Sequence, residues 1–159
     1  SPFPGCGDGM SPLEYTVFVD SVNGDDSQAI LGSAENPYKF FSSGVSALPV
    51  DDGKTWTFVF LDNTARTMSA IPNRSIILKT ENIGTFNFVD LGLSQIIPTT
   101  CPYFEINAPR SNLLIQDTTP TGFRPLHLKL TLNNIYIKCT QSTIFGLLGS
   151  GASNNDDSG

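Results

Sequence analysis

The chain of 159 residues has little charge, and its cations are not clustered. Asp, Glu, Lys and Arg make up 15% of it, below the roughly 25% usual for globular domains, so the chain is not a charge-driven disordered segment. The nine Lys and Arg residues are scattered, and the formal net charge is -6. Because neutralising phosphates requires clustered cations, the sequence argues against nucleic acid as a partner.

Long apolar runs and clusters of reactive side chains are also missing. No apolar run approaches the ~20 residues of a membrane span, so we expect no membrane insertion. The single histidine, His127, alternates with leucines, which predicts a solvent-facing side chain and argues against a catalytic triad. Cys6, Cys101 and Cys139 are too far apart for a paired-cysteine metal motif, and their redox state stays open. We expect no catalytic residues and no cofactor.

What the chain has instead is Ser, Thr, Asn, Gly and Pro between short apolar runs. With 39% hydrophobic residues, this composition is typical of many short strands joined by tight bends. Runs rich in β-branched and aromatic residues predict strands at 15–19, 57–61, 75–78, 85–89, 103–106, 112–115, 126–132 and 135–137.

Residues 36–48 carry the only helical pattern. Asn36 suits an N-cap, Pro37 suits the first helical position, and Pro49 ends the helix. Gly44 weakens it, so we expect packing to hold it in place. A single amphipathic helix ahead of the longer strands is suited to cover an open end of a stack.

The spacing of the strands favours coils stacked in parallel. Phe58 and Phe86 are 28 residues apart, and Phe86 and Leu113 are 27 apart, which is typical of a solenoid. An antiparallel sandwich also has short, regularly spaced strands. Its hairpins favour Asn-Gly or Asp-Gly turns, and we find no clear one between adjacent strands after residue 57.

We divide the chain into three parts. Residues 1–13 form a flexible arm rich in Pro and Gly, 14–148 form the β-domain with its helix at about 36–48, and 149–159 form a flexible linker or truncated tail. The chain starts without an initiator Met or a secretory leader, so we expect a processed chain or a piece of a longer one.

The segment 17–49 has a distinctive order of motifs. The strand Val17-Phe18-Val19 ends in Asp20, a loop with Gly24-Asp25 follows, and Asn36-Pro37-Tyr38 leads into the short helix. This order, over about a fifth of the chain, resembles the opening of pectate-lyase-like right-handed β-helix proteins. Phe40-Phe41-Ser42-Ser43 stands where a Thr-Ile-type pair and an alanine are more usual, which leaves the subfamily open.

The resemblance makes the prediction of stacked coils more specific, because it implies one fold class. We predict an all-β protein, a short right-handed parallel β-helix of few coils with one N-terminal capping α-helix. Proteins with this opening include polysaccharide lyases, phage tailspikes, bacterial surface proteins and structural proteins of large DNA viruses. The chain is therefore expected to be a non-catalytic structural protein of a viral particle or appendage, acting in assembly or attachment at an extracellular or virion surface.

Two other functions stay open. One is a polysaccharide-binding or polysaccharide-degrading module, a lyase or hydrolase truncated from a larger enzyme; the other is an adhesin repeat. For the structural role, the expected partners are other copies of the chain or other shell or appendage proteins, because an open last coil exposes strand edges.

Acidic loops were considered as metal or catalytic sites. Asp20, Asn23, Asp25 and Asp26 place several oxygens in one Gly-containing loop, and calcium prefers six to eight oxygen ligands. The loop lacks the closing glutamate of an EF-hand, so we favour a structural turn, which uses the same residue types. Asp51-Asp52 is likewise interpreted as a turn, since adjacent side chains diverge.

The remaining polar and aromatic residues give weaker indications. Asn133-Asn134 predicts the start of a ladder of stacked amides. The arginines are interpreted as surface charge and the aromatics as a sugar-stacking surface. The arginines are Arg66, Arg74, Arg110 and Arg124, and the aromatics are Tyr38, Trp56, Tyr103 and Tyr136.

Overall fold

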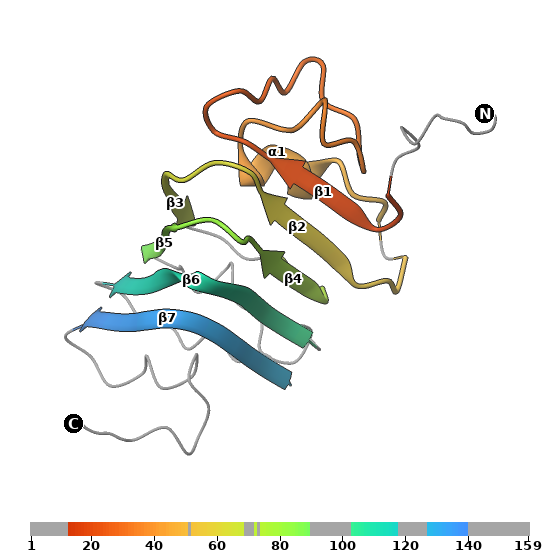
Figure 1. Ribbon diagram of the computed structural model, residues 1–159. Coiled ribbons are helices and arrows are strands. Elements are labelled where there is room, and N and C mark those ends of the chain that lie inside the picture. The colour runs from red at the N-terminus through yellow and green to blue at the C-terminus, as the bar shows by residue number, and fades with distance from the viewer. Residues whose placement is uncertain are drawn as a thin grey trace.

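Seven strands and one short helix make up the regular structure in the described residues of the computed structural model (Figure 1). The structure describes residues 13–50, 52–68, 72, 74–89, 103–117 and 127–139. The elements are β1 (Thr16–Val19), α1 (Phe41–Ser46), β2 (Trp56–Phe60), β3 (Ala65–Met68), β4 (Ile76–Lys79), β5 (Gly84–Val89), β6 (Tyr103–Asp117) and β7 (His127–Cys139). Except for Leu13, the predicted arm 1–13 lies outside the described residues, as does the predicted tail 149–159.

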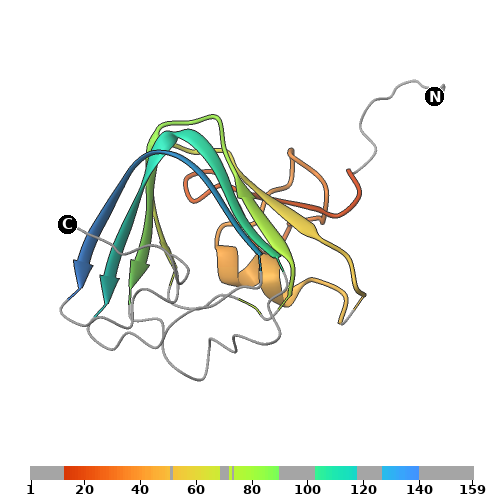
Figure 2. The same ribbon diagram turned by 90° about the horizontal axis from the view of Figure 1, so that it is seen from below.

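Every pair of described strands is parallel, in one sheet that bends into two faces. The strand order is β1-β2-β4-β6-β5-β3, and β7 pairs with β6. The first half of β6 pairs with β4 and its second half with β5, so β6 runs across both faces. The register of β6 and β7 shifts between Ala108 and Asn112, at the bend between the faces. Seen along the stack, the sheet is strongly curled (Figure 2).

We call the two sides of the bend the first face and the second face. The first face comprises β1, β2, β4 and the first halves of β6 and β7; the second comprises β3, β5 and the second halves of β6 and β7. Between β2 and β3 the chain turns the corner in only four residues, 61–64. The predictions of an all-β fold and of parallel pairing rather than hairpins are both confirmed in the described strands.

The spacing between stacked positions is irregular. On the first face Phe58 pairs with Leu78, Leu78 with Ile106 and Ile106 with Leu130, which gives spacings of 20, 28 and 24 residues. The predicted spacing from Phe86 to Leu113 joins two neighbouring strands. The one from Phe58 to Phe86 joins the two faces instead, so it is not a repeat of the stack.

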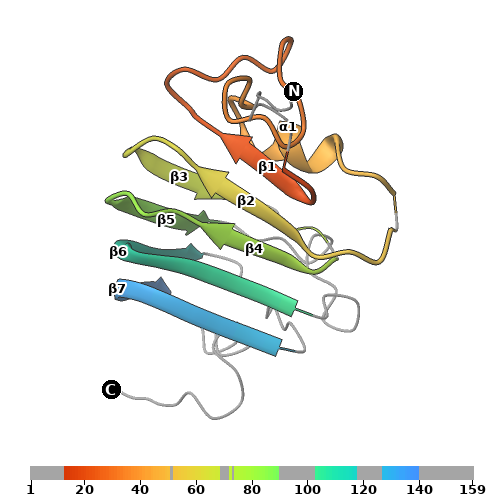
Figure 3. The same ribbon diagram turned by 45° about the vertical axis from the view of Figure 1, so that its right-hand side comes forward.

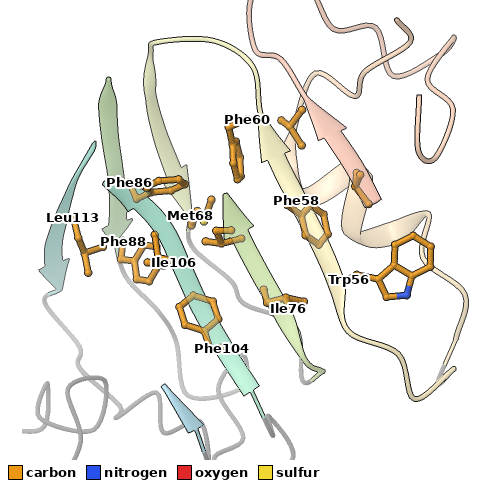
Figure 4. Close-up of a cluster of buried hydrophobic side chains, with 14 of the residues drawn as sticks. Trp56, Phe58, Phe60, Met68, Ile76, Phe86, Phe88, Phe104, Ile106 and Leu113 are labelled. Carbon is orange, nitrogen blue, oxygen red and sulfur yellow. The ribbon is translucent and has the colours of Figure 1, made fainter. Parts of the chain in front are cut away.

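Alternate residues of the strands point into the space between the two faces (Figure 4). Phe58, Phe86, Phe88, Phe104 and Ile106 have no exposed surface, and burying each such side chain stabilises the fold by roughly 1.5–3 kcal/mol. The rings also contact one another between strands, with the Phe88 and Phe104 centroids 6.2 Å apart and steeply tilted. This interior row fixes the strand register, because a shift by one residue would expose it.

The helix is shorter than predicted and starts later. It covers Phe41–Ser46, so the predicted N-cap at Asn36 and first position at Pro37 are wrong. The reason is tertiary, since Tyr38 forms a parallel bridge to Val19 in β1. The Tyr38 N–H donates to the Phe18 carbonyl at 2.8 Å, which keeps this segment extended before the helix begins.

The helix α1 packs closely on the inner side of β1 and β2 (Figure 1). Gly44 is buried there, and a Cβ at this position would lie 2.8 Å from Val17 Cγ1 and 3.2 Å from the Phe58 ring. The Phe41 and Phe58 rings are 4.8 Å apart between centroids. Glycine at this position therefore lowers the helix propensity, but its missing Cβ allows α1 to lie close to the sheet.

Candidate functional site

A cavity of about 240 Å³ lies between the end of β1, the start of α1 and the corner that joins β2 to β3. Half of its lining is apolar and the rest is charged or hydroxylated. The lining residues are Val19, Ser21, Lys39, Phe40, Phe41, Phe60, Asp62, Arg66, Thr67 and Met68. They come from segments that are far apart in the sequence and that the stack brings together.

Arg66 in the wall of this cavity is a buried cation. Its side chain is only 6% exposed, and its guanidinium lies 5.4 Å from the Phe60 ring and 5.0 Å from the Phe86 ring. One guanidinium nitrogen, Nη2, donates to the carbonyl of Asp62, whereas Nε and Nη1 are buried without a hydrogen-bond partner. Burial lowers the pKa of Arg66, an effect that the Asp62 charge partly offsets. Arginine remains charged in proteins, so two donors of a buried cation lack an acceptor.

The prediction of surface charge is therefore wrong for Arg66. The sequence Ala65-Arg66-Thr67-Met68 has few strand-favouring residues, and the strand β3 was not predicted. Pairing with β5 makes it a strand, and alternation then directs Arg66 and Met68 inward and leaves Thr67 exposed. Gly84 opposite leaves room for the guanidinium, since a Cβ there would collide with it.

Asp62 holds the corner beside the cavity. Its carboxylate accepts hydrogen bonds from the Ser21 N–H at 3.1 Å, the Ser21 hydroxyl at 2.7 Å, and the N–H and hydroxyl of Thr64. Burial alone would raise the pKa of Asp62, but the bonds from Thr64 and Ser21 outweigh it and lower the pKa from 3.8 to about 2. Four hydrogen bonds thus reach this carboxylate, three of them on Oδ2 and one on Oδ1.

Lys39 supplies a second cation at the cavity. Its Nζ donates to the Ser21 carbonyl at 3.3 Å. With Lys39 and Arg66 positive and Asp62 negative, the lining carries a net charge of +1. The carboxylates of Asp25 and Asp26 lie close to Lys39 outside this lining.

The loop with Asp20, Asn23, Asp25 and Asp26, considered for calcium but favoured as a structural turn, is a set of separate turns. Asp20 accepts from the backbone of Val22 and Asn23, and Asp25 accepts from the N–H and hydroxyl of Ser27. Asp26 instead accepts from the Lys39 N–H and the Ser43 hydroxyl, both at 2.7 Å. Within the described ranges, no three His, Cys, Asp or Glu side chains are grouped to hold a metal ion. These carboxylates accept hydrogen bonds from nearby backbone and hydroxyl groups, and so they stabilise the turns of the loop that leads from β1 to α1.

The four predicted stacking aromatics do not share a surface. Tyr38 and Trp56 are buried, so the prediction is wrong for both. Trp56 begins the inward row of β2, packs edge-on against Tyr15 at 5.6 Å, and donates from Nε1 to Asp52 at 2.8 Å. Tyr103 is half-buried and donates to Glu105 at 2.6 Å, whereas Tyr136 is exposed on β7.

The other predicted polar residues have mixed outcomes. Arg74 forms an ion pair with Asp52 at 2.7 Å, whereas Arg110 is exposed as predicted and Arg124 lies outside the described residues. His127 is exposed, as its alternation with leucines predicts. Asn133 donates from its side chain to the Asn112 amide oxygen at 3.0 Å, which confirms one rung of the predicted amide ladder. Cys6 and Cys101 also lie outside the described residues, and Cys139 ends β7.

The strand β7 is the last described strand of the stack (Figure 3). Among the described strands it pairs only with β6, and no other described strand pairs with its second edge. Its inward residues Leu128, Leu130 and Leu132 are only partly buried. Their β6 partners Phe104 and Ile106 are fully buried. The inward residues of β7 are thus less buried than their partners in β6.

Comparisons with known proteins found no match for the chain among family models, curated proteins or solved structures. In the part of the chain that the structure describes, no helix has the length and apolar character needed to span a membrane.

Proposed function

We propose that the chain is a non-catalytic structural module, a short right-handed parallel β-helix that assembles through its β7 end. The observation that carries the proposal is that no other described strand pairs with the second edge of β7, together with the row of only partly buried inward leucines. An edge of this kind is a template for pairing with another strand, and stable monomers normally cover or blunt it. Pairing there would satisfy the backbone and bury the leucines.

The opposite end of the stack is already closed. Tyr38 bridges to Val19, its carbonyl accepts from the Asp20 N–H at 2.8 Å, and α1 covers the inner side of β1. A copy that stacked head to tail would have to displace this cap. We therefore propose that two copies meet through their β7 edges, in an antiparallel pairing related by a two-fold axis, which closes after two chains.

The sequence after β7 favours a second copy over a further coil of the same chain. Spacings of 20 to 28 residues would place the counterparts of Leu128 and Leu130 at 148–158. That segment is rich in Gly, Ser, Asn and Asp and has no alternating apolar residues. Another β7 supplies the apolar alternation that this segment lacks.

The setting we propose is a particle or appendage surface. Support comes from the low charge, the polar uncharged turns and the resemblance of residues 17–49 to the opening of tailspike-like and virion proteins. Other shell proteins are the alternative partners at β7. A polysaccharide-binding role has less support, because two of its four predicted aromatics are buried.

Analytical ultracentrifugation tests the proposal with a matched pair of variants. Leu130→Lys places a charge in the inward row, whereas Thr131→Lys places the same charge on the exposed side of the same strand. We expect the wild type and Thr131→Lys to be dimers and Leu130→Lys to be a folded monomer, with folding checked by circular dichroism. A wild-type chain that stays folded and monomeric at all concentrations contradicts the proposal, as does a Leu130→Lys dimer.

A further inference from the structure

We infer that the two copies of the proposed dimer meet bend on bend, so that the first half of each β7 faces the second half of the other. In this alignment Leu132 lies opposite Ile135 of the second copy, and Asn133 lies opposite Asn134. The inference rests on the proposed dimerisation through β7 and specifies which residues face each other in it. Its support is the symmetry of β7 about its bend, the apolar surface of both halves and the polar side chains along the bend.

The inward positions of β7 are arranged symmetrically about its bend. The strand passes across both faces (Figure 2), and Leu132 and Ile135 each pair with a fully buried residue of β6, which places both on the inward side. Residues three apart in a regular strand point to opposite sides, so the register shift at the bend breaks the alternation here. The midpoint between the two residues lies between Asn133 and Asn134. A two-fold axis through this midpoint exchanges the two halves of β7 and leaves the inward side facing inward.

This alignment covers the inward side of both halves of β7. Leu130 and Leu132 are partly buried, and Ile135 is 43% exposed although its β6 partner Leu113 is fully buried. A pairing centred on Leu130 would join residues 127–132 of the two copies and leave Ile135 uncovered. A shift of one residue from the bend would set inward positions against outward ones, and a larger shift would set each bend against a straight part of the other strand. Pairing bend on bend therefore removes the most apolar surface from water.

Polar side chains near the bend link each layer of the stack to the next. The donors are Thr80, Asn82, Ser111 and Asn133, and the acceptors are the carbonyls of Phe60, Leu61 and Asn82 and the amide oxygen of Asn112, at 2.7–3.0 Å. Asn133 and Asn134 are exposed at the β7 end of this column. A primary amide both donates and accepts, so Asn133 of one copy and Asn134 of the other offer matching groups where they face each other. The column of hydrogen bonds thus continues across the two-fold axis.

Single cysteines test the alignment in a chain whose three native cysteines are replaced by serine. Pairing bend on bend places position 134 of the two copies about 6 Å apart between Cα atoms, within disulfide range. Positions 130 and 131 of the two copies lie more than about 10 Å apart, which no disulfide spans. Under mild oxidation we expect Asn134→Cys to form a cross-linked dimer at least about tenfold faster than Leu130→Cys or Thr131→Cys, as measured by non-reducing electrophoresis.

Sedimentation of the reduced variants separates failure of the alignment from failure of the proposed dimer. If the reduced protein is a dimer and Leu130→Cys or Thr131→Cys cross-links as fast as Asn134→Cys, the copies meet in another register and the inference is overturned. A dimer in which none of the three variants cross-links overturns it as well. A folded monomer in every case contradicts the proposed dimer, and the alignment with it.

Charge reversal near the end of β7 gives a second test. The alignment sets Lys129 opposite position 138 of the second copy, which is also a lysine, and like charges on facing strands weaken pairing. Lys138→Glu makes both symmetric contacts pairs of opposite charge, so we expect it to tighten the dimer by about threefold or more at low salt. Lys79→Glu, the same change at an exposed position of β4, should leave dimerisation unchanged. Equal dissociation constants for Lys138→Glu and the wild type, measured by analytical ultracentrifugation, contradict the alignment.

Discussion

The two ends of the stack contrast in how they finish the sheet. At the β1 end, the loop 20–38 covers the strand edge and α1 fills the inner side, so that Val17 and Phe58 are fully buried. At the β7 end, no described strand pairs with the second edge of β7, and Leu130 is only partly buried. The same strand pattern therefore gives a well-buried end where a cap covers it and a less buried end where no cap is described.

Truncating one inward residue at each end tests this contrast most strongly. Phe58→Ala removes a fully buried ring that contacts α1 and should lower the free energy of unfolding by about 3–5 kcal/mol. Leu130→Ala should cost less, about 1–2 kcal/mol, because its side chain is already partly in water.

Urea titration of both variants at low protein concentration measures the two free energies of unfolding without a contribution from dimerisation. Equal losses at the two ends would mean that Leu130 is buried in the isolated chain, and the contrast would no longer hold.

The close contact between α1 and β1 gives the next largest effect. Gly44→Ala would gain helix propensity of about 1 kcal/mol, but its Cβ would lie 2.8 Å from Val17 Cγ1. Overpacking of this kind costs about 1–3 kcal/mol, so we expect a net destabilisation of about 1 kcal/mol.

Ser46→Ala, at an exposed position of the same helix, is the matched control. It gains propensity without a clash and should be stabilising by a few tenths of a kcal/mol. Thermal unfolding of both variants separates the two effects. If Gly44→Ala is also stabilising, α1 is able to move away from the sheet, and the cap is looser than its geometry indicates.

Much of the fold was predictable because its signals are local. The inward row of β2 is visible as alternating Trp56, Phe58 and Phe60, and the lack of hairpin turns indicated parallel pairing. The strand β3 was not predictable, because β5 makes Arg66 an inward residue and the Phe60 and Phe86 rings accommodate its charge. Whether such a residue belongs to a strand and points inward depends on long-range contacts, and local sequence patterns do not contain them.

The start of α1 and the cavity were missed for the same physical reason. Asn36-Pro37 has the local features of a helix start, yet a backbone bond from Tyr38 to β1 overrides them. The wall of the cavity combines Ser21, Lys39 and Arg66, which come together only when the segments around β1, α1 and β3 pack against one another. Carboxylates in the loop 20–26 have the residue types of metal ligands, but their partners are nearby backbone and hydroxyl donors.

The smallest predicted change in stability concerns Asp62, which lies at the corner between β2 and β3 near the capped end of the stack. Hydrogen bonds lower the folded-state pKa of this carboxyl to about 2, below its ordinary value of 3.8. Its contribution to stability is therefore fully present above about pH 5 and is lost as the pH falls through 4 towards 2. Because solvent screens part of the interaction, we expect a loss on the order of 1 kcal/mol.

Asp62→Asn separates this contribution from general acid unfolding. The amide keeps the shape but cannot ionise or accept at both ends, so the variant should be less stable than the wild type at pH 7. At pH 2.5 this gap should shrink to about a third, because the carboxyl of the folded wild type is then only partly ionised. Chemical denaturation at both pH values measures the difference. If the gap between the two proteins is the same at pH 7 and pH 2.5, the ionised carboxylate does not hold the corner. If the gap narrows in acid, a charge at the turn between the two faces helps to keep the capped end closed.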